Sequence, residues 1–261
     1  VISQLVSGVL CLIYMIKKFD ILHLSREEMQ FNPFYISRLC GVGIPMGLQY
    51  SITAIGSILI QTAVNGLGST YVAAVTAATK VSQLLCCPID AMGSTMATYG
   101  GQNVGAGKIK RVGRGLFDCS CLGVGYSIVA FLIILFLGRT ISMLFVNDAN
   151  AGSVEEILAL SQQFLVCNGA FYILLAFVNI VRFLIQGMGF SQIAIFSGVF
   201  EMIARGVVAL AMVPTLGFNA VCFANPAAWL FADCFLFPLF FWSYNKLKKK
   251  FGMKDAEKEV V

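Results

Sequence analysis

The feature that most constrains this chain is a series of long apolar segments separated by short polar stretches. An α-helix needs about 20 apolar residues to cross a hydrocarbon core of ~30 Å. Inside that core, an isolated segment satisfies its own backbone hydrogen bonds only as a helix. The sequence therefore predicts an all-α, polytopic membrane helix bundle. Six full spans are expected, at approximately residues 42–65, 71–98, 118–145, 157–181, 192–213 and 219–244.

The composition agrees with a membrane protein. Hydrophobic residues make up 58% of the 261 positions, charged residues make up only 12%, and the mean hydropathy is +0.83. An ordinary soluble domain carries about 25% charged residues. The formal net charge is +5. This excess follows from where the basic residues fall relative to the spans, so a nucleic-acid partner is not expected.

Neither an enzyme nor a metal-binding protein is expected. The single histidine, His23, lies in a polar loop, whereas most of the nine cysteines lie in or beside apolar runs. Cysteine–histidine metal sites require close spacing of such ligands. A nucleophile with a nearby base is also not evident. We therefore expect no metal and no other cofactor.

The stretch "GGQNVGAGKIKR" at residues 100–111 has the glycines and basic residues of a phosphate-binding loop. A Walker loop, however, needs a glycine five residues before Gly107 and a hydroxyl residue after Lys108. Gln102 and Ile109 occupy those two positions. A strand should also precede the loop, and here a long apolar helix precedes it. We interpret the stretch as a tight, basic loop between two spans.

Most basic residues fall on one predicted side of the membrane. They occur in the loop 17–41, in the loop 100–116, at Arg182 in the third loop of that side, and in the tail 245–261. The loops of the opposite side contain none. The positive-inside rule makes the basic side cytoplasmic, and its charges suit contact with anionic membrane lipid. We expect a multi-pass protein of the cell membrane with its C-terminus in the cytoplasm.

Several short motifs, taken in order, resemble the multidrug and toxic compound extrusion (MATE) family. They are "GIPMGLQ" at 43–49, "GGQNVGAGK" at 100–108, "RFLIQGMG" at 182–189, "GVFEMIARG" at 198–206 and "FANPAAW" at 223–229. The resemblance covers essentially the whole chain, and the ordered set is more specific than any one motif. It implies a secondary transporter of twelve helices in two six-helix lobes.

The resemblance also implies how the chain is divided. Residues 1–16 look like the truncated end of a transmembrane helix, and residues 17–41 like the cytoplasmic loop between lobes. Residues 42–244 look like the six-helix C-terminal lobe, followed by the basic cytoplasmic tail 245–261. The missing N-terminal lobe of the same polypeptide is then an expected partner.

The family's activity is exchange of H⁺ or Na⁺ for a small organic substrate. The resemblance therefore implies export of organic, often cationic, drugs or metabolites through a cleft between the lobes. Related flippases of lipid-linked saccharides share the fold and remain the alternative. Those proteins generally lack the glutamine-glycine loop, and few cations are available within these spans to meet a pyrophosphate.

Charged side chains within spans are the candidates for ion coupling, because each costs ~2.5–3.5 kcal/mol at a helix centre and usually has a partner or a function. The acids are Glu201, Asp90 and Asp233, and their candidate charge partners are Arg205 and Lys80. Glu201 and Arg205 stand four residues apart, the favourable order for a pair. They form either a structural pair or an exchange site for H⁺ or Na⁺. Lys80 is a possible partner for Asp233.

Some relatives within the resembled family carry acids on the first and fourth helices of this lobe. In this chain those helices hold glutamines and asparagines, and the acids lie on the second, fifth and sixth. The coupling site therefore lies either at these acids or in the missing lobe.

The first full span carries polar residues every four positions. A strict period of four drifts by about 40° per step on a 3.6-residue helix, so the stripe winds slowly around the span. Such residues either join membrane helices by hydrogen bonds or line a wet cleft. The candidate substrate contacts are Gln49, Thr53 and Gln61 on this span and Gln83 on the next.

Overall fold

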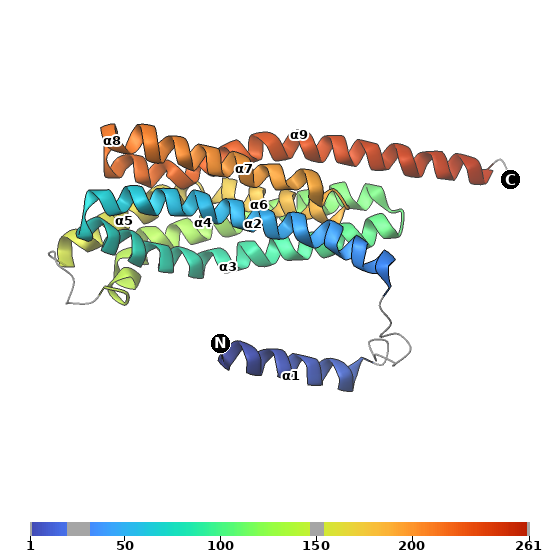
Figure 1. Cartoon of the computed structure of the whole chain (residues 1–261), viewed down its shortest axis with the longest axis horizontal. Helices are drawn as coiled ribbons and strands as arrows, with labels where there is room; N and C mark the ends of the chain where they lie inside the picture. Colours follow the sequence, from blue (N-terminus) through green and yellow to red (C-terminus); the bar gives the residue numbers. More distant parts are fainter. Residues whose placement is uncertain (1, 20–31, 147–153, 260–261) are drawn as a thin grey trace. The chain divides into compact units, whose positions relative to one another are not determined.

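The computed structural model describes residues 2–19, 32–146 and 154–259, and these residues are helical apart from short connections (Figure 1). The helices in chain order are α1 (Ile2–Lys18), α2 (Pro33–Leu67), α3 (Ser69–Gly105), α4 (Ile109–Met143), α5 (Val154–Ala170), α6 (Tyr172–Gly187), α7 (Ser191–Val207), α8 (Val213–Leu216) and α9 (Phe218–Glu259). A π-helical turn, η2 (Val208–Met212), joins α7 to α8. The prediction of an all-α bundle is confirmed.

Within the described residues, five helical segments are long and apolar enough to cross a membrane. These are α2, α3, α4, the continuous segment Ser191–Leu216 that contains α7, and α9 up to Gly252. The remaining predicted span, 157–181, is a bent pair, in which α5 and α6 meet at 52° on either side of Phe171. The six predicted spans thus correspond to six helical segments, one of them broken. Most helices run several residues beyond the predicted ends.

The chain divides into two compact units, Val1–Cys40 and Gly41–Val261. The first contains α1, which buries none of its residues, and the start of α2. The second contains the helix bundle with the rest of α2. All of the sites described below lie in the second unit.

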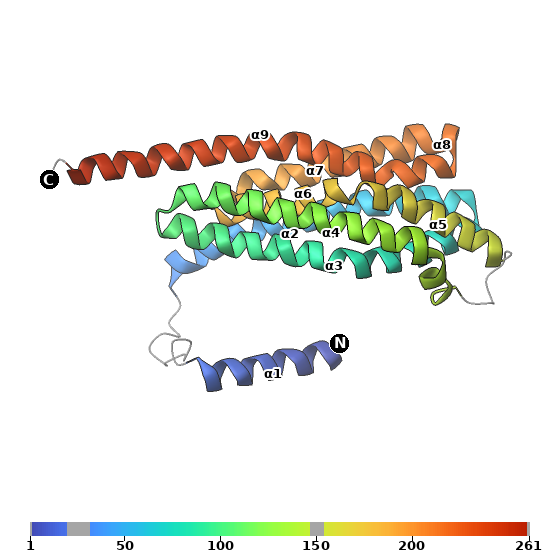
Figure 2. The same ribbon diagram turned by 180° about the vertical axis from the view of Figure 1, so that it is seen from behind.

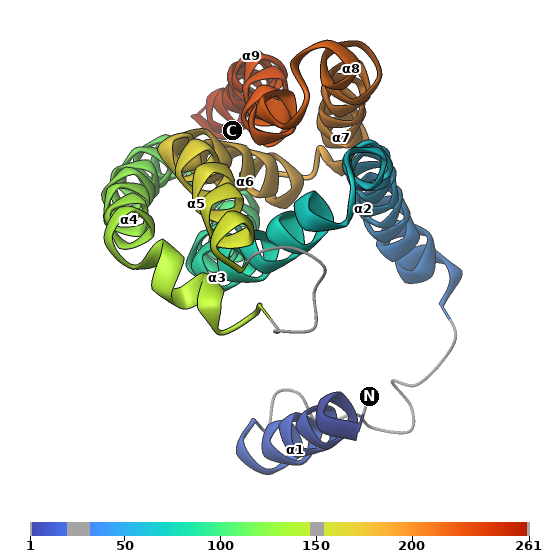
Figure 3. The same ribbon diagram turned by 90° about the vertical axis from the view of Figure 1, so that its left-hand side faces the viewer.

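Helix α6 lies in the middle of the bundle, with α3, α4, α7 and α9 around it (Figure 3). The view from behind shows α3 and α4 side by side, joined by a tight turn (Figure 2). The fully buried side chains are mostly branched aliphatic residues, among them Ile180, Leu184 and Ile185 of α6. The central position of α6 means that a polar residue on it is enclosed by neighbouring helices.

The glycine stretch at 100–111 differs from the expected loop. Helix α3 continues to Gly105 and α4 starts at Ile109, so only Ala106–Lys108 lie between them. The preceding glycines serve helix packing: a Cβ on Gly100 would lie 2.7 Å from Leu184 Cδ1 of α6. Small residues let membrane helices approach closely. The motif therefore brings α3 against α6 and then ends in a turn.

The α3–α4 turn, the α6–α7 connection and the C-terminal part of α9 meet at one end of the bundle. Phe251 of α9 lies beside the α3–α4 turn, since a Cβ on Gly107 would lie 3.5 Å from Phe251 Cδ1. Lys246 of α9 lies over the ring of Phe190, between α6 and α7, at 5.6 Å from the ring centroid. This arrangement agrees with the predicted topology, in which these two connections and the tail share one side of the membrane.

Candidate functional site

A cluster of charged side chains lies inside the bundle where α6 and α7 meet. Arg182 of α6 forms an ion pair with Glu201 of α7, and Arg205 Nη1 lies 3.5 Å from Glu201 Oε2. Arg182, Glu201 and Arg205 are 8%, 3% and 6% exposed. The Glu201–Arg205 pair was expected from the spacing of one helical turn. One carboxylate thus lies between two guanidinium groups.

Sequence reasoning placed Arg182 in a loop, and this placement is wrong. Helix α6 extends to Gly187 and carries Arg182 into the interior. The error arose because Arg182 follows directly after the predicted span 157–181, and a charged residue at the end of an apolar run was assigned to the loop. The sequence did contain a pattern that indicates a helix through Arg182. Asn179, Arg182 and Gln186 follow one another at three- and four-residue intervals and so share one face of a helix.

Helix α2 contributes amide and backbone groups to the cluster. The Gln49 amide lies within 3.1 Å of Arg182 Nε and 3.2 Å of Arg182 Nη1, and it lies 2.6 Å from the Gln186 amide. With its oxygen toward Arg182, Gln49 accepts from both guanidinium nitrogens, and its nitrogen donates to Gln186 when the Gln186 amide is also turned to present its oxygen. Arg205 Nη1 donates to the backbone oxygen of Thr53 at 3.4 Å. Two predicted cleft residues, Gln49 and Thr53, therefore contact the charged cluster.

Glycines allow α2 to approach α7 closely enough for these contacts. A Cβ on Gly198 of α7 would lie 3.1 Å from Gln49 Cγ, and a Cβ on Gly56 of α2 would lie 3.1 Å from Met202 Cα. Both distances are tighter than ordinary van der Waals contact, so the helix backbones are nearly touching. These glycines set the position of Gln49 relative to the ion pair.

Asp233 of α9 is the second acid near the cluster. It is 5% exposed, and neither of its carboxylate oxygens has a hydrogen-bond partner among the described residues. Arg182 and Glu201 are the charged groups with which it interacts electrostatically. Burial of a carboxylate without a hydrogen-bond partner is costly. Asp233 is therefore the least satisfied charged group in this region.

A polar cavity of about 210 Å³ adjoins the cluster. Arg182, Gln49 and Gln186 line one part of it, and Asp90 and Asn179 line another. Asn179 Nδ2 donates to Asp90 Oδ1 at 3.1 Å. Arg182 therefore contacts Glu201 and also borders the cavity, so one side chain connects the buried acids with a space that can admit a polar group.

The other predicted site residues lie apart from this cluster. Lys80 is exposed, and its Nζ lies 5.7 Å from the centroid of the Phe145 ring. In the described part of the chain no ion pair joins Lys80 to Asp233. Gln61 and Gln83 are also exposed, and Gln61 Nε2 donates to Asn65 at 3.0 Å. The polar stripe of α2 thus starts buried at Gln49 and winds to the surface by Gln61, as a period of four requires.

Among the described residues, no group of three or more His, Cys, Asp or Glu side chains is placed to hold a metal ion. The buried cluster contains two acids and two arginines, so its formal charges balance.

The chain belongs to the MatE family, whose model matches residues 45–211. A probable multidrug resistance protein, YpnP, of Bacillus subtilis (strain 168) is 24% identical over 214 residues. That match covers 82% of this chain and 47% of YpnP. The chain therefore spans about half the length of this curated relative.

Solved structures show the same fold. A multidrug resistance MATE family transporter of the MOP superfamily, in an outward-facing conformation, superposes with a TM-score of 0.84 at 17% identity, covering 95% of this chain and 55% of that one. A MATE protein in the bent conformation gives 0.82 at 16% identity, covering 96% and 55%. A MOP superfamily transporter from Pyrococcus furiosus gives 0.79 at 15% identity, covering 95% and 54%. The chain is thus a multi-pass membrane bundle that corresponds to part of a MATE fold.

Proposed function

We propose that this chain is one lobe of a secondary active transporter that exports small organic, often cationic, compounds in exchange for H⁺ or Na⁺. The observation that carries the proposal is the buried group of Arg182, Glu201, Arg205 and Asp233 beside a polar cavity. Charged residues within a membrane bundle are rare and usually mark an ion or substrate pathway. Membership of the MatE family supports the same class of activity.

Asp233 is the proposed exchange site among the three candidate acids. Glu201 has two guanidinium partners, and Asp90 accepts from Asn179. The carboxylate of Asp233 has no hydrogen-bond donor among the described residues. A proton or a Na⁺ ion bound there would supply a direct partner for a buried carboxylate that has no hydrogen-bond donor, so Asp233 gains most from binding a cation. Glu201 then serves mainly to balance the arginines.

Arg182 connects the exchange site to the cavity. It interacts with Asp233 and Glu201 and also lines the space next to Gln49 and Asp90. When Asp233 binds a cation, the two arginines face a single remaining negative charge, and the potential in the cavity becomes more positive. A cationic substrate is then repelled, and by linkage a bound substrate weakens cation binding to the same extent. This competition is what antiport requires.

A second lobe is proposed to complete the cleft. This chain covers only about half of the matched relatives, and transporters of this kind bind substrate where two repeats meet. Helix α2 supports this arrangement, because only Gln49, Gly56 and Val64 are buried along its 35 residues. We propose that part of its exposed surface faces the partner lobe, and that the basic end of the bundle is cytoplasmic, as the positive-inside rule indicates.

The test uses the parent polypeptide with both lobes, reconstituted in liposomes. Efflux of a fluorescent organic cation is followed under an imposed H⁺ or Na⁺ gradient for wild type, Asp233→Asn and Glu201→Gln. Asp118→Asn, an exposed acid on α4, is the matched control. We expect gradient-driven efflux in wild type and control, and loss of its gradient dependence in Asp233→Asn.

The alternative outcomes each have a meaning. Gradient-driven efflux that survives Asp233→Asn but is lost in Glu201→Gln moves the exchange site to Glu201. Efflux that survives both substitutions moves coupling out of this cluster. Absence of efflux in wild type, together with transbilayer movement of a lipid-linked saccharide, supports the flippase alternative.

A further inference from the structure

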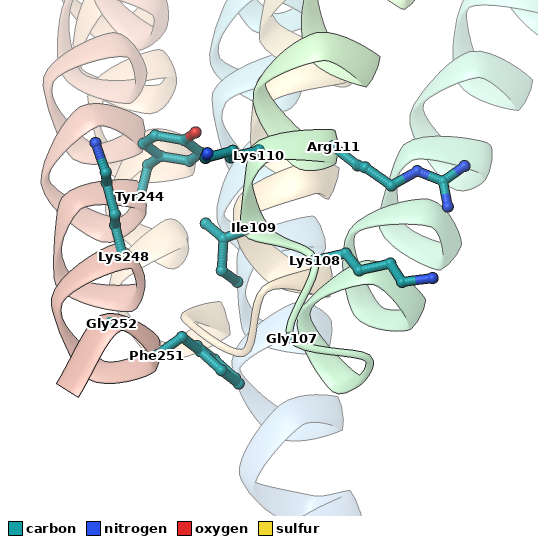
Figure 4. Close-up of a pocket in the computed structure, with 9 residues that line it drawn as sticks. All are labelled: Gly107, Lys108, Ile109, Lys110, Arg111, Tyr244, Lys248, Phe251 and Gly252. Atoms are coloured by element: carbon teal, nitrogen blue, oxygen red, sulfur yellow. The ribbon is translucent and has the colours of Figure 1, made fainter. Parts of the chain in front are cut away.

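A second cavity, of about 440 Å³, lies at the basic end of the bundle and shares no lining residue with the ion cluster (Figure 4). It forms between the first residues of α4 and the C-terminal part of α9. Residues 107–111 line one side, and Tyr244, Lys248, Phe251 and Gly252 line the other. The mechanism proposed above does not use this space, which we call the basic groove.

The floor of the basic groove is apolar. Ile109 and Phe251 point into the space between the two helices (Figure 4), and Ile109 is 6% exposed. Tyr244 borders the groove and packs on α4, since a Cβ on Gly113 would lie 3.4 Å from its hydroxyl oxygen. A ligand that fills the groove must therefore carry an apolar part.

The rim of the groove is cationic. Lys110 reaches toward the Tyr244 ring on the α4 side, and Lys248 projects from α9 (Figure 4). Lys108 and Arg111 point away on the far side of the turn and extend the basic surface. All four cations are exposed, and the described residues that line the groove include no acidic side chain. The complementary ligand is therefore an anion.

The position of the groove indicates where that ligand comes from. The groove lies at the start of one predicted membrane helix, at Ile109 of α4, and at residues 248–252 of α9, next to the basic stretch that follows the apolar run of that helix. A molecule at that depth meets hydrocarbon on one side and headgroups on the other. Basic residues next to a membrane helix attract anionic lipid headgroups. A free inorganic anion would pair with the cations but would make no contact with the apolar side chains of Ile109 and Phe251.

We propose that the basic groove binds an anionic phospholipid. Its phosphate lies between Lys110 and Lys248, and its glycerol and the first methylenes of an acyl chain lie on Ile109 and Phe251. Bound in this way, the lipid joins α9 to the α3–α4 turn, two segments that meet at the same membrane surface.

The test is native mass spectrometry of the full chain in detergent, titrated with phosphatidylglycerol or with phosphatidylcholine of the same acyl chains. Wild type is compared with the double variant Lys110→Gln/Lys248→Gln. The control is Lys249→Gln/Lys250→Gln, which removes the same charge from exposed positions of α9 that do not line the groove. Phe251→Ala tests the apolar floor, and inorganic phosphate is added as a competitor.

We expect wild type and control to retain phosphatidylglycerol in preference to phosphatidylcholine. The groove variant Lys110→Gln/Lys248→Gln should bind phosphatidylglycerol about 25-fold more weakly, or about fivefold for each lysine. Phe251→Ala should also weaken the binding of phosphatidylglycerol. Equal losses in the two double variants would overturn the proposal, because attraction would then be diffuse. A lack of preference for the anionic lipid, or full displacement by inorganic phosphate, would also overturn it.

Discussion

Arg182 and Glu201 form an ion pair between α6 and α7, and their side chains are only 9% and 4% exposed. The attraction within such a pair roughly repays the cost of removing both groups from water, so the pair adds little net stability. Removing one partner is different, because the other charge stays buried. An arrangement of α6 and α7 that separated the two charges would leave both buried without a partner. The pair therefore favours this one arrangement, and the loss of stability on removing either partner can be measured.

Arg182→Gln should lower the free energy of unfolding by about 3 kcal/mol, because Glu201 keeps only the longer contact with Arg205. Glu201→Gln should be comparably destabilising, since it leaves two buried guanidinium groups. The double variant should lose less than the sum of the two. Reversible unfolding of the chain in mixed detergent micelles measures these differences.

The matched control for this cycle is the exposed pair of Arg139 and Glu155, whose side chains are 49% and 75% exposed. Arg139→Gln should change stability by less than about 1 kcal/mol. If Arg182→Gln and Arg139→Gln have the same effect, the cluster does not behave as a buried charge pair.

Gly187→Ala should destabilise the bundle by about 1–3 kcal/mol. A Cβ at Gly187 would overlap the backbone carbonyl of Ala97 on α3, and a backbone atom cannot move aside as the end of a side chain can. Gly125→Ala on α4 is the control, since nothing lies within 4 Å of its Cβ position. That change should be neutral or stabilising, because alanine has the higher helix propensity. Equal effects at both positions would show that α3 and α6 are not in close contact.

Gln49→Ala should cost about 1–3 kcal/mol, because the buried polar groups of Arg182 and Gln186 then lose the amide with which they form hydrogen bonds. Gln61→Ala on the same helix removes an exposed amide that bonds only to Asn65 among the described contacts. Its effect should stay within about 0.5 kcal/mol. A Gln61→Ala effect as large as that of Gln49→Ala would mean that both amides support packing to a similar degree.

The membrane spans could be predicted from the sequence because the hydrocarbon core acts on each segment independently. Any run of suitable length and apolarity must form a helix there, so six spans follow without knowledge of their packing. The Glu201–Arg205 contact was predictable for a similar reason, since it lies within one helix. The ends of the helices could not be predicted from apolarity, because polar residues such as Gln102 and Asn103 continue α3 beyond the apolar run.

Contacts between helices could not be derived from spacing. The pairing of Arg182 with Glu201 depends on how α6 and α7 are rotated about their axes, and that rotation is set by packing of the whole bundle. For the same reason Lys80, on α3, lies over Phe145 and makes no ion pair with Asp233 in the described structure. Sequence reasoning therefore named most members of the cluster but omitted the arginine at its centre.

The turn between α3 and α4 gives a last prediction. Gly107 has φ of +71°, in the left-handed region that other residues enter at a cost of roughly 1–2 kcal/mol. Gly107→Ala should lower stability by about that amount. Gly105→Ala, two residues earlier at the end of α3, has open space around its Cβ position and a normal φ, so it should be neutral or slightly stabilising. Because Phe251 packs beside Gly107, a shifted turn should also weaken retention of phosphatidylglycerol by the basic groove. Loss of stability in Gly105→Ala but not in Gly107→Ala would contradict this account of the turn.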